Sequence, residues 1–301
     1  MDVSEYRKRY TDQLEAAERP SAREEEHGAV AALATLLDRD QEESQRLVAL
    51  RAISRDVTHN PRLFDRLIEL LGDTTEPASL RIAALDALQQ GTFLVQIFAP
   101  KRPAYLQVLR SVVDDPDTEL RRRAIGVLAR EKDEYVQRRL LNGLMHPSKA
   151  VVPAAKAIQY LGYDVHTAYF PLLRRIVERP PSVGAKREAI RLLSADPKSR
   201  PLLTKLLTDR QQPSDVRNMS ALALQALAPA RFEGIARKIA LDDDEDDRLR
   251  ATSLSALAHF AKPDTTARQR MFSRKVQSLH ERARSPEVKR ATKTFMTRAS
   301  G

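Results

Sequence analysis

Apolar and polar positions follow a pattern that recurs along the chain. An apolar residue is followed by a basic residue, two variable positions and a small residue, and another apolar residue comes four positions later. The clearest copy is Leu80-Arg81 with Ala84 and Leu88. Because steps of three and four place these residues on one face of a helix, each copy predicts a helix that buries one side.

The pattern repeats at intervals that suit a helical hairpin. A second apolar-periodic segment precedes each copy, as with Leu63, Leu67 and Leu71, and a turn rich in Asp and Pro separates the two. We expect about eight hairpins, each made of helix A, a turn and helix B, stacked because no hairpin buries both faces alone. The basic position, 31 to 40 residues apart, is Arg46, Arg81, Arg121, Lys186, Arg217, Arg250 and Lys289, with Val152 in a degenerate copy.

The Asp/Pro turn followed by Val/Leu-Arg-x-x-Ala and a later Ala-Leu resembles the HEAT repeat, particularly the short variety of phycobilisome-lyase-like proteins. The likeness covers about residues 30–299. It implies an all-α fold, a right-handed α-α superhelix or HEAT-like α-solenoid, whose B helices line a concave face that binds macromolecules. It also implies that the repeated basic residue bridges to turn carboxylates of its own or the adjacent hairpin.

The pattern predicts two parts: a charged N-terminal cap or tail at 1–28 and a single repeat array at 29–299. The first part lacks the apolar core of a secretory signal. No apolar run approaches the roughly 20 residues of a transmembrane helix. We therefore expect a cytoplasmic protein with no membrane partner, and the excess of arginine over lysine favours a bacterial source.

The net charge of +10 is unevenly placed. Residues 1–100 carry 12 basic and 18 acidic side chains, whereas residues 101–301 carry 39 basic and 23 acidic. This asymmetry indicates an acidic partner for the C-terminal part, or attraction between the two halves of the array.

Side chains one and five positions after the repeated basic residue are expected to project from helix B toward the concave face. A row of arginines there suits phosphate or acidic-peptide binding. The candidate binding residues, with Arg123 beside them, are Arg51, Arg122, Arg123, Arg187, Arg191, Asn218 and Arg290.

Three segments depart from the repeat. Residues 93–98 are apolar and either begin an extended helix A or form a loop offered to a partner. Residues 242–247 are all acidic and form either a solvated turn or a latch onto the basic C-terminal helices. Residues 160–170 hold Tyr160, Tyr163, His166, Tyr169 and Phe170, which either pack between hairpins or contact a partner.

Catalytic motifs are missing from the sequence. There is no cysteine, and the histidines are scattered without zincin spacing. Deoxyhypusine hydroxylase, whose fold is similar, binds two irons through repeated His-Glu pairs, but here only His280-Glu281 has that order. The aromatic-lined site of HEAT-like DNA glycosylases is not apparent either, and phycobilin lyases are similar only at the level of the repeat.

The sequence therefore favours a non-catalytic scaffold that needs no cofactor or metal and holds an acidic or helical protein partner. The alternative is a nucleic-acid-binding module with a continuous basic groove. The sequence does not determine the oligomeric state.

Overall fold

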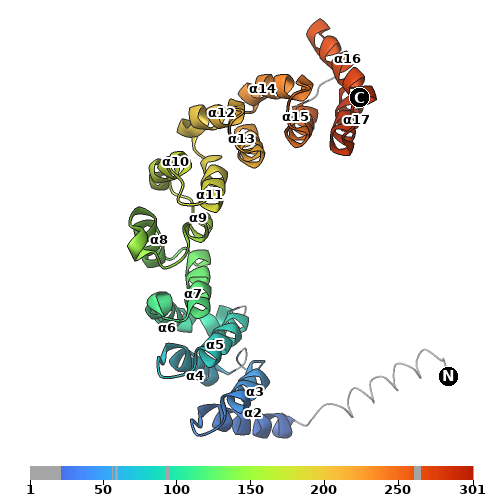
Figure 1. The fold of residues 1–301 in the computed structure, drawn as a ribbon. Helices are drawn as coiled ribbons and strands as arrows, with labels where there is room; N and C mark the ends of the chain where they lie inside the picture. The colour runs from blue at the N-terminus through green and yellow to red at the C-terminus, as the bar shows by residue number, and fades with distance from the viewer. Residues whose placement is uncertain (1–21, 56, 58–59, 93–94, 261–265, 301) are drawn as a thin grey trace, which may run out of the picture. The chain divides into compact units, whose positions relative to one another are not determined.

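A computed structural model describes residues 22–55, 57, 60–92, 95–260 and 266–300, and the regular structure within these ranges is helical (Figure 1). The chain forms two compact units, which meet in sequence between Val136 and Gln137. The helices of the first unit are α2 (Ala22–Leu37), α3 (Glu43–Ile53), α4 (Pro61–Gly72), α5 (Ala78–Gly91), α6 (Val95–Ser111) and α7 (Thr118–Arg130). Those that follow are α8 (Glu134–Met145), α9 (Ala154–Leu161), α10 (Phe170–Glu178), α11 (Val183–Leu193), α12 (Arg200–Thr208), α13 (Ser214–Leu227), α14 (Pro229–Leu241), α15 (Asp247–Phe260), α16 (Ala267–Arg282) and α17 (Pro286–Ser300).

The helices pair as predicted into eight consecutive hairpins, from α2–α3 to α16–α17. Each even-numbered helix is helix A and each odd-numbered helix is helix B. B helices also contact one another within each unit, α3 with α5 and α5 with α7 in the first, and α11 with α13, α13 with α15 and α15 with α17 in the second. Helix α2 begins at Ala22, and residues 1–21 of the predicted cap or tail lie outside the described residues.

Turn residues start the helices as their chemistry predicts. The Asn60 side chain accepts hydrogen bonds from the amides of Arg62 and Leu63, and Pro61 occupies the first helical position of α4. Ser182 accepts from the Ala185 amide at the start of α11. Pro153 directly precedes α9, which runs for only 8 residues.

The repeated pattern forms the buried face of each helix B. Leu80, Ala84 and Leu88 are fully buried, as are the apolar residues Leu67 and Leu71 on the facing helix A. The small side chain at the Ala84 position allows the two helices to approach closely. The period read from the sequence therefore describes the contact between the two helices of a hairpin.

The repeated basic residue joins one hairpin to the next, in an arrangement that we call the arginine ladder. Arg46 donates through Nε to the Leu36 carbonyl (2.9 Å) and pairs through its guanidinium with Glu76 (2.8 Å). Leu36 lies in the last turn of α2, whose carbonyls have no partner within the helix. Arg46 therefore caps its own helix A and bonds to the next hairpin's turn.

The same geometry recurs at two more rungs. Arg81 bonds to the Leu71 carbonyl (3.0 Å) and Asp115 (2.6 Å). Arg217 bonds to the Leu207 carbonyl (2.9 Å) and Glu245 (2.6 Å). These arginines are more than nine-tenths buried, which confirms the predicted bridge to turn carboxylates.

The acceptor carboxylates of the ladder lie at similar sequence distances from the next ladder residue. Glu76 and Glu245 each lie five residues before the next ladder residue, and Asp115 lies six before. The rung is weaker where the acceptor is neutral, because Lys186 donates only to the side-chain amide oxygen of Gln212 (2.9 Å). Like Glu76 and Glu245, Gln212 lies five residues before the next ladder residue, here Arg217. Because each rung needs a matched donor and acceptor, the ladder continues only where both are present.

Arg250 shows the effect of a mismatched acceptor. The position five residues before Lys289 is Arg284, a like charge. The Arg250 guanidinium instead bonds to Asp243 (2.9 Å) and Asp247 (3.3 Å) in the turn that precedes it.

The acidic residues 242–247 are therefore mainly the acceptors of this ladder. Asp242 pairs with Arg210, Glu245 with Arg217, and Asp246 accepts from the Leu249 amide at the start of α15. Among the described residues, this segment is linked to the C-terminal helices by the ion pair of Asp243 with Arg282 (3.1 Å), which is exposed. The carboxylates of residues 242–247 therefore bond mainly to nearby arginines of the array, and the contact expected of a latch amounts to one surface ion pair among the described residues.

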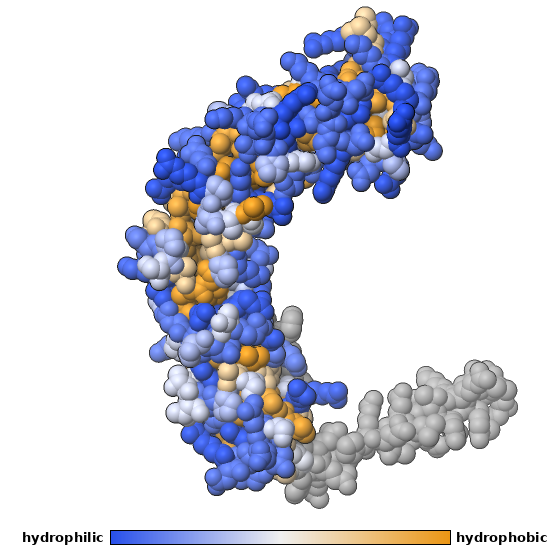
Figure 2. Space-filling view, in the orientation of Figure 1, coloured by the Kyte–Doolittle hydropathy of each residue, from blue (hydrophilic) through white to orange (hydrophobic). Residues whose placement is uncertain are grey.

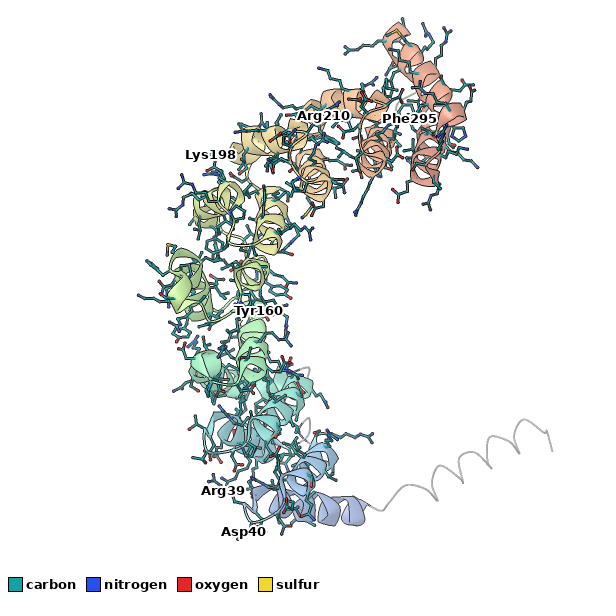
Figure 3. The ribbon with its side chains drawn as sticks, viewed as in Figure 1. Arg39, Asp40, Tyr160, Lys198, Arg210 and Phe295 are labelled. Carbon is teal, nitrogen blue, oxygen red and sulfur yellow. The ribbon has the colours of Figure 1, made fainter. Side chains whose placement is uncertain are left out.

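Most aromatic side chains in the segments that depart from the repeat pack inside the two units. Phe98, in α6, contacts Phe64 (6.0 Å between ring centroids) and Tyr105 (5.7 Å), so residues 95–98 begin an extended helix A and residues 93–94 lie outside the described part. Figure 3 shows the side chains, including Tyr160 on α9. Tyr160 is buried, as are Tyr169 and Phe170, whereas Tyr163 and His166 are exposed.

Candidate binding surface on the B helices

A groove crosses three consecutive B helices of the second unit, α13, α15 and α17. Its volume is about 510 Å³. The residues that line it are Leu222, Gln225, Arg248, Ala251, Thr252, Ser255, Ala256, His259, Glu287, Arg290, Ala291 and Thr294. We call this feature the B-helix groove.

The groove has the register that the repeat predicts. Leu222, Ser255 and Thr294 lie five residues after Arg217, Arg250 and Lys289, and Ala251 and Arg290 lie one residue after. In a helix of 3.6 residues per turn these positions share one face. These positions of α13, α15 and α17 therefore line one groove, and Arg290 is among them.

Charge in the groove is concentrated on two arginines. Arg248 and Arg290 are both exposed, and neither forms an ion pair with another described residue. Glu287 is the acidic side chain on the wall, and exposed His259 adds an imidazole ring. A carboxylate on a bound peptide would meet two guanidinium groups able to bond it bidentately.

The groove also offers apolar surface. Leu222 is half exposed on α13, and Ala256 and Ala291 are buried in the floor. Small floor residues and surrounding hydroxyls leave an open, mixed surface that accepts peptide side chains.

The other predicted arginines are held by carboxylates of the same chain. In the first unit, Arg123 on α7 bonds to Glu119 (2.7 Å) and reaches Asp86 on α5 (2.7 Å), while Arg122 also bonds to Glu119 (2.7 Å). Hydrogen bonds from Arg123 and Arg122 lower the pKa of Glu119. Hydrogen bonds to Glu119 and Asp86 raise the pKa of Arg123.

The second unit repeats this balance. Arg187 on α11 pairs with Asp215 at the start of α13, and Arg191 pairs with Glu188 (2.8 Å). Each positive side chain thus lies beside a negative one, so this part of the B-helix face alternates in sign.

The two remaining candidates differ in exposure. Arg51 is exposed on α3, but Asn218 is buried, which corrects its expected place on the open surface. Asn218 lies on α13 between α11 and α15, which both contact α13. Its short side chain ends below the surface there.

Sequence reasoning missed Leu222, Arg248 and His259. Their signal was helical spacing, because Arg248, Thr252, Ser255 and His259 follow steps of four, three and four along α15. The search for basic residues one and five positions after the ladder residue excluded all three.

His280, the histidine of the one His-Glu pair in the sequence, has a hydrogen-bonding partner on the neighbouring helix. His280 Nδ1 lies 2.8 Å from the Thr292 hydroxyl, between α16 and α17. Within the described ranges, no three His, Asp or Glu side chains are grouped closely enough to hold a metal ion. No helix in the same ranges combines the length and the apolar character that crossing a bilayer requires.

Comparison with known proteins finds similar solved structures but no matching sequence family. No known family matches the sequence, and no curated protein does. The structure of human deoxyhypusine hydroxylase in complex with glycerol is similar at 15% identity, over 82% of this chain and 98% of that chain, with a TM-score of 0.34. The complex of CpcE and CpcF of phycocyanin lyase from a Nostoc species is similar at 19% identity, over 89% of this chain and 94% of that chain, with a TM-score of 0.27.

The fold is an all-α, HEAT-like α-solenoid. This conclusion rests on the eight hairpins and on the B helices that stack within each unit. The low TM-scores of the two similar structures carry no argument about what this chain binds.

Proposed function

We propose that this chain is a non-catalytic scaffold that holds an acidic or helical protein partner against the B-helix groove. The observation that carries the proposal is the groove itself. It places Arg248 and Arg290 beside an exposed Leu222 on an open surface. Arginines at the rim of an apolar strip suit an amphipathic segment with carboxylates.

The alternating charge of the B-helix face favours a protein over a nucleic acid. Phosphate backbones require a continuous row of unpaired cations. Arg123 and Arg187 are instead bonded to Asp86 and Asp215 of neighbouring helices. We also propose that the protein acts in the cytoplasm, where an acidic segment of another soluble protein is the partner.

The test is partner capture with charge-reversed grooves. The wild-type chain is used to capture and identify partners, and the Kd of each is then measured with purified proteins. We expect Arg248→Glu/Arg290→Glu to weaken binding by at least about tenfold, a change of about 1.4 kcal/mol. Arg231→Glu is the matched control, because Arg231 is exposed on α14, a helix A outside the groove.

Two results would overturn the proposal. One is a partner whose Kd is the same for the wild type and the groove variant. The other is tight binding of duplex DNA that weakens steeply between 50 and 200 mM salt, roughly 10³-fold or more, which indicates phosphate contacts.

A further inference from the structure

The hairpin of α8 and α9 lacks both partners of the arginine ladder. Val152, which the sequence pattern places at the ladder position, lies before α9. Ala157 is the fourth residue after the N-cap Pro153, as Arg81 is after Pro77 and Arg217 is after Pro213, so Ala157 occupies the ladder position. Pro181, five residues before Lys186, occupies the position at which Glu76 and Glu245 accept elsewhere. The donor and the acceptor of this rung are therefore both replaced by apolar residues.

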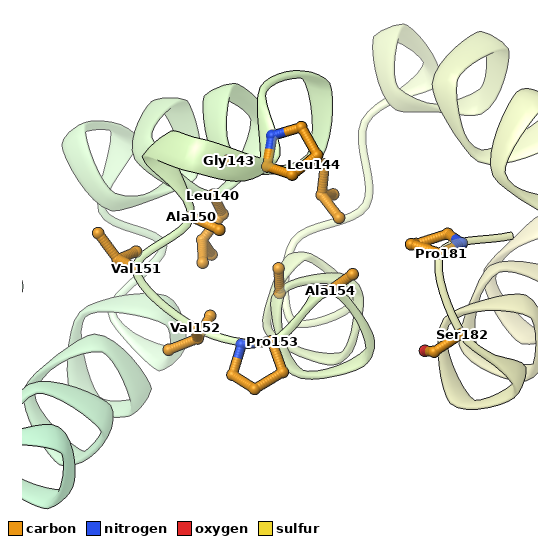
Figure 4. Close-up of a pocket in the computed structure, with 12 residues that line it drawn as sticks. Leu140, Gly143, Leu144, Ala150, Val151, Val152, Pro153, Ala154, Pro181 and Ser182 are labelled. Atoms are coloured by element: carbon orange, nitrogen blue, oxygen red, sulfur yellow. The ribbon is translucent and has the colours of Figure 1, made fainter.

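A cavity of about 340 Å³ lies where the rung would be (Figure 4). Its walls include Leu144 in the last turn of α8, Ala157 at the ladder position and Pro181 at the acceptor position. These are the three places that Arg46, Arg81 and Arg217 join in other hairpins. The cavity is thus the space of an absent rung, and we call it the open-rung pocket.

The lining of the open-rung pocket is almost entirely apolar. Its one polar side chain, Ser182, accepts a hydrogen bond from the Ala185 amide and caps α11. The remaining wall residues are Leu140, Gly143, Leu144, Pro147, Ala150, Val151, Val152, Pro153, Ala154, Ala157 and Pro181.

The pocket is large enough for a bulky side chain. An apolar cavity of about 150 Å³ in another protein admits benzene, and this pocket has roughly twice that volume. A Phe or Leu side chain would find an apolar environment there and gain about 1.5–3 kcal/mol on full burial.

Close packing fixes the shape of the wall. A Cβ at Gly143 would lie 2.9 Å from the Ala150 Cα, so α8 and the turn that follows it touch at the backbone. A Cβ at Gly184 would likewise lie 3.2 Å from the Ala155 Cβ. The chain is therefore closely packed at Gly143, in the wall of the pocket, and at Gly184, beside the wall residue Ser182.

Two exposed cations adjoin the wall in sequence: Lys149 lies between the wall residues Pro147 and Ala150, and Arg179 lies two residues before Pro181. No carboxylate lies within two residues of a wall residue in the sequence. Figure 2 shows hydrophobic surface over α8 and α9 among hydrophilic neighbours, and exposed Met145 and Val183 adjoin the wall in sequence. An apolar pocket with a positive rim is complementary to an apolar side chain flanked by carboxylates.

We propose that the open-rung pocket docks one bulky apolar side chain of an acidic, helical segment of a partner protein. An apolar anchor in a central pocket supplies most of the affinity in such interfaces, and the surrounding cations select the acidic partner. This surface is separate from the B-helix groove, and the proposal does not require that groove.

The test uses three labelled peptides and the full chain. The first is a short helical peptide rich in Glu with a central Phe, the second has Ala in place of that Phe, and the third has Lys in place of every Glu. Fluorescence anisotropy should give a Kd for the acidic Phe peptide at least about tenfold below those of the other two.

Two variants close the pocket in different ways. Ala154→Leu fills it with a side chain, and Ala157→Arg/Pro181→Glu rebuilds the rung. Each should abolish the preference for Phe over Ala, whereas Ala230→Leu, at an exposed site on α14, should keep it. Circular dichroism and thermal melting verify that each variant is folded.

Several outcomes would overturn the proposal: equal binding of the Phe and Ala peptides, equal binding of the Lys peptide, or a Phe preference that survives both variants. Loss of the preference in Arg248→Glu/Arg290→Glu alone would place the peptide in the B-helix groove and would also overturn it. These outcomes distinguish failure of the open-rung pocket proposal from failure of the B-helix groove proposal.

Discussion

Arginine side chains have different roles in this protein according to where their partners lie. Arg217 is buried against Glu245, while Arg210, seven residues earlier in the preceding turn, pairs with Asp242 at the surface (Figure 3). Arg290 has no ion-pair partner among the described residues. The first two stabilise the stack to different degrees, and only the third is available to a ligand without the loss of an internal pair.

Replacement of Arg217 by Ala should destabilise the protein strongly. The Arg217 and Glu245 side chains are only 7% and 5% exposed, and loss of one partner from a buried pair costs about 3–5 kcal/mol. Arg210→Ala is the matched control, since Arg210 is 55% exposed and such pairs contribute about 0.2–1 kcal/mol. Urea unfolding followed by circular dichroism measures both.

The double variant Arg217→Met/Glu245→Leu separates charge from packing. Because it leaves no uncompensated charge, it should lose less stability than Arg217→Ala. Equal losses in Arg217→Ala and Arg210→Ala would contradict the distinction between buried rung and surface pair.

Acid should weaken the rung at Glu245. Burial acts to raise the pKa of this carboxyl, but the hydrogen bonds and charge of Arg217, with the Asp246 amide, bring the net pKa below its ordinary value of 4.5. A carboxyl with a lowered pKa contributes stability above its unfolded-state pKa, and this contribution is lost as pH falls through the lower, folded-state value. Stability should therefore decline below pH 4.5, and less steeply in Glu245→Gln. Identical slopes for the two proteins would contradict the assignment.

Elements approach one another most closely where the side chain is smallest. In the α8–α9 hairpin, Gly143 lets the chain at Ala150 rest against α8. In α14, Gly234 faces open space, with nothing within 4 Å of an added Cβ. The same residue type is therefore required by packing in one helix and dispensable in the other.

A pair of glycine substitutions tests this difference. Gly143→Ala should lower the melting temperature, because overpacking against backbone costs about 1–3 kcal/mol. Gly234→Ala should raise it, because Ala restricts the unfolded chain and stabilises by about 0.4–1 kcal/mol. Differential scanning calorimetry of both variants gives the signs, and shifts in the same direction would refute the contact at Ala150.

Across the whole molecule, the ladder is present in two stretches. Rungs at Arg46 and Arg81 lie in the first unit, and the rungs at Lys186 and Arg217 lie in the second. The α8–α9 hairpin has no rung. Since the stability of a repeat array depends on each repeat and on its contacts with neighbours, this hairpin should open most readily.

Hydrogen exchange should reveal this weak point. We expect amides of α9 to exchange faster than those of α5 and α13, which carry Arg81 and Arg217. The rebuilt rung, Ala157→Arg/Pro181→Glu, should slow exchange in α9 without affecting α5. Unchanged exchange in α9 of this variant would show that the rung does not control local opening.

The sequence by itself determined the helices, their pairing and the period of the ladder. These depend on local physics: apolar steps of three and four, Pro and Asp in turns, and a basic residue at one register position. The resemblance that followed from this pattern also anticipated the bridge from Arg46 and Arg81 to turn carboxylates. Arg290 lines the B-helix groove with the equivalent positions of α13 and α15 because helix geometry alone fixes which side chains share a face.

Tertiary structure decided which charges are available and where the surface is hollow. Arg123 is paired because Asp86, on a helix 37 residues away in sequence, lies beside it. Asn218 is buried because α11 and α15 pack on either side of α13. The open-rung pocket arises because Ala157 and Pro181 of the next hairpin line the same cavity, and no local pattern shows that juxtaposition. Burial and ion pairing depend on neighbours in space, whereas periodicity depends only on neighbours in sequence.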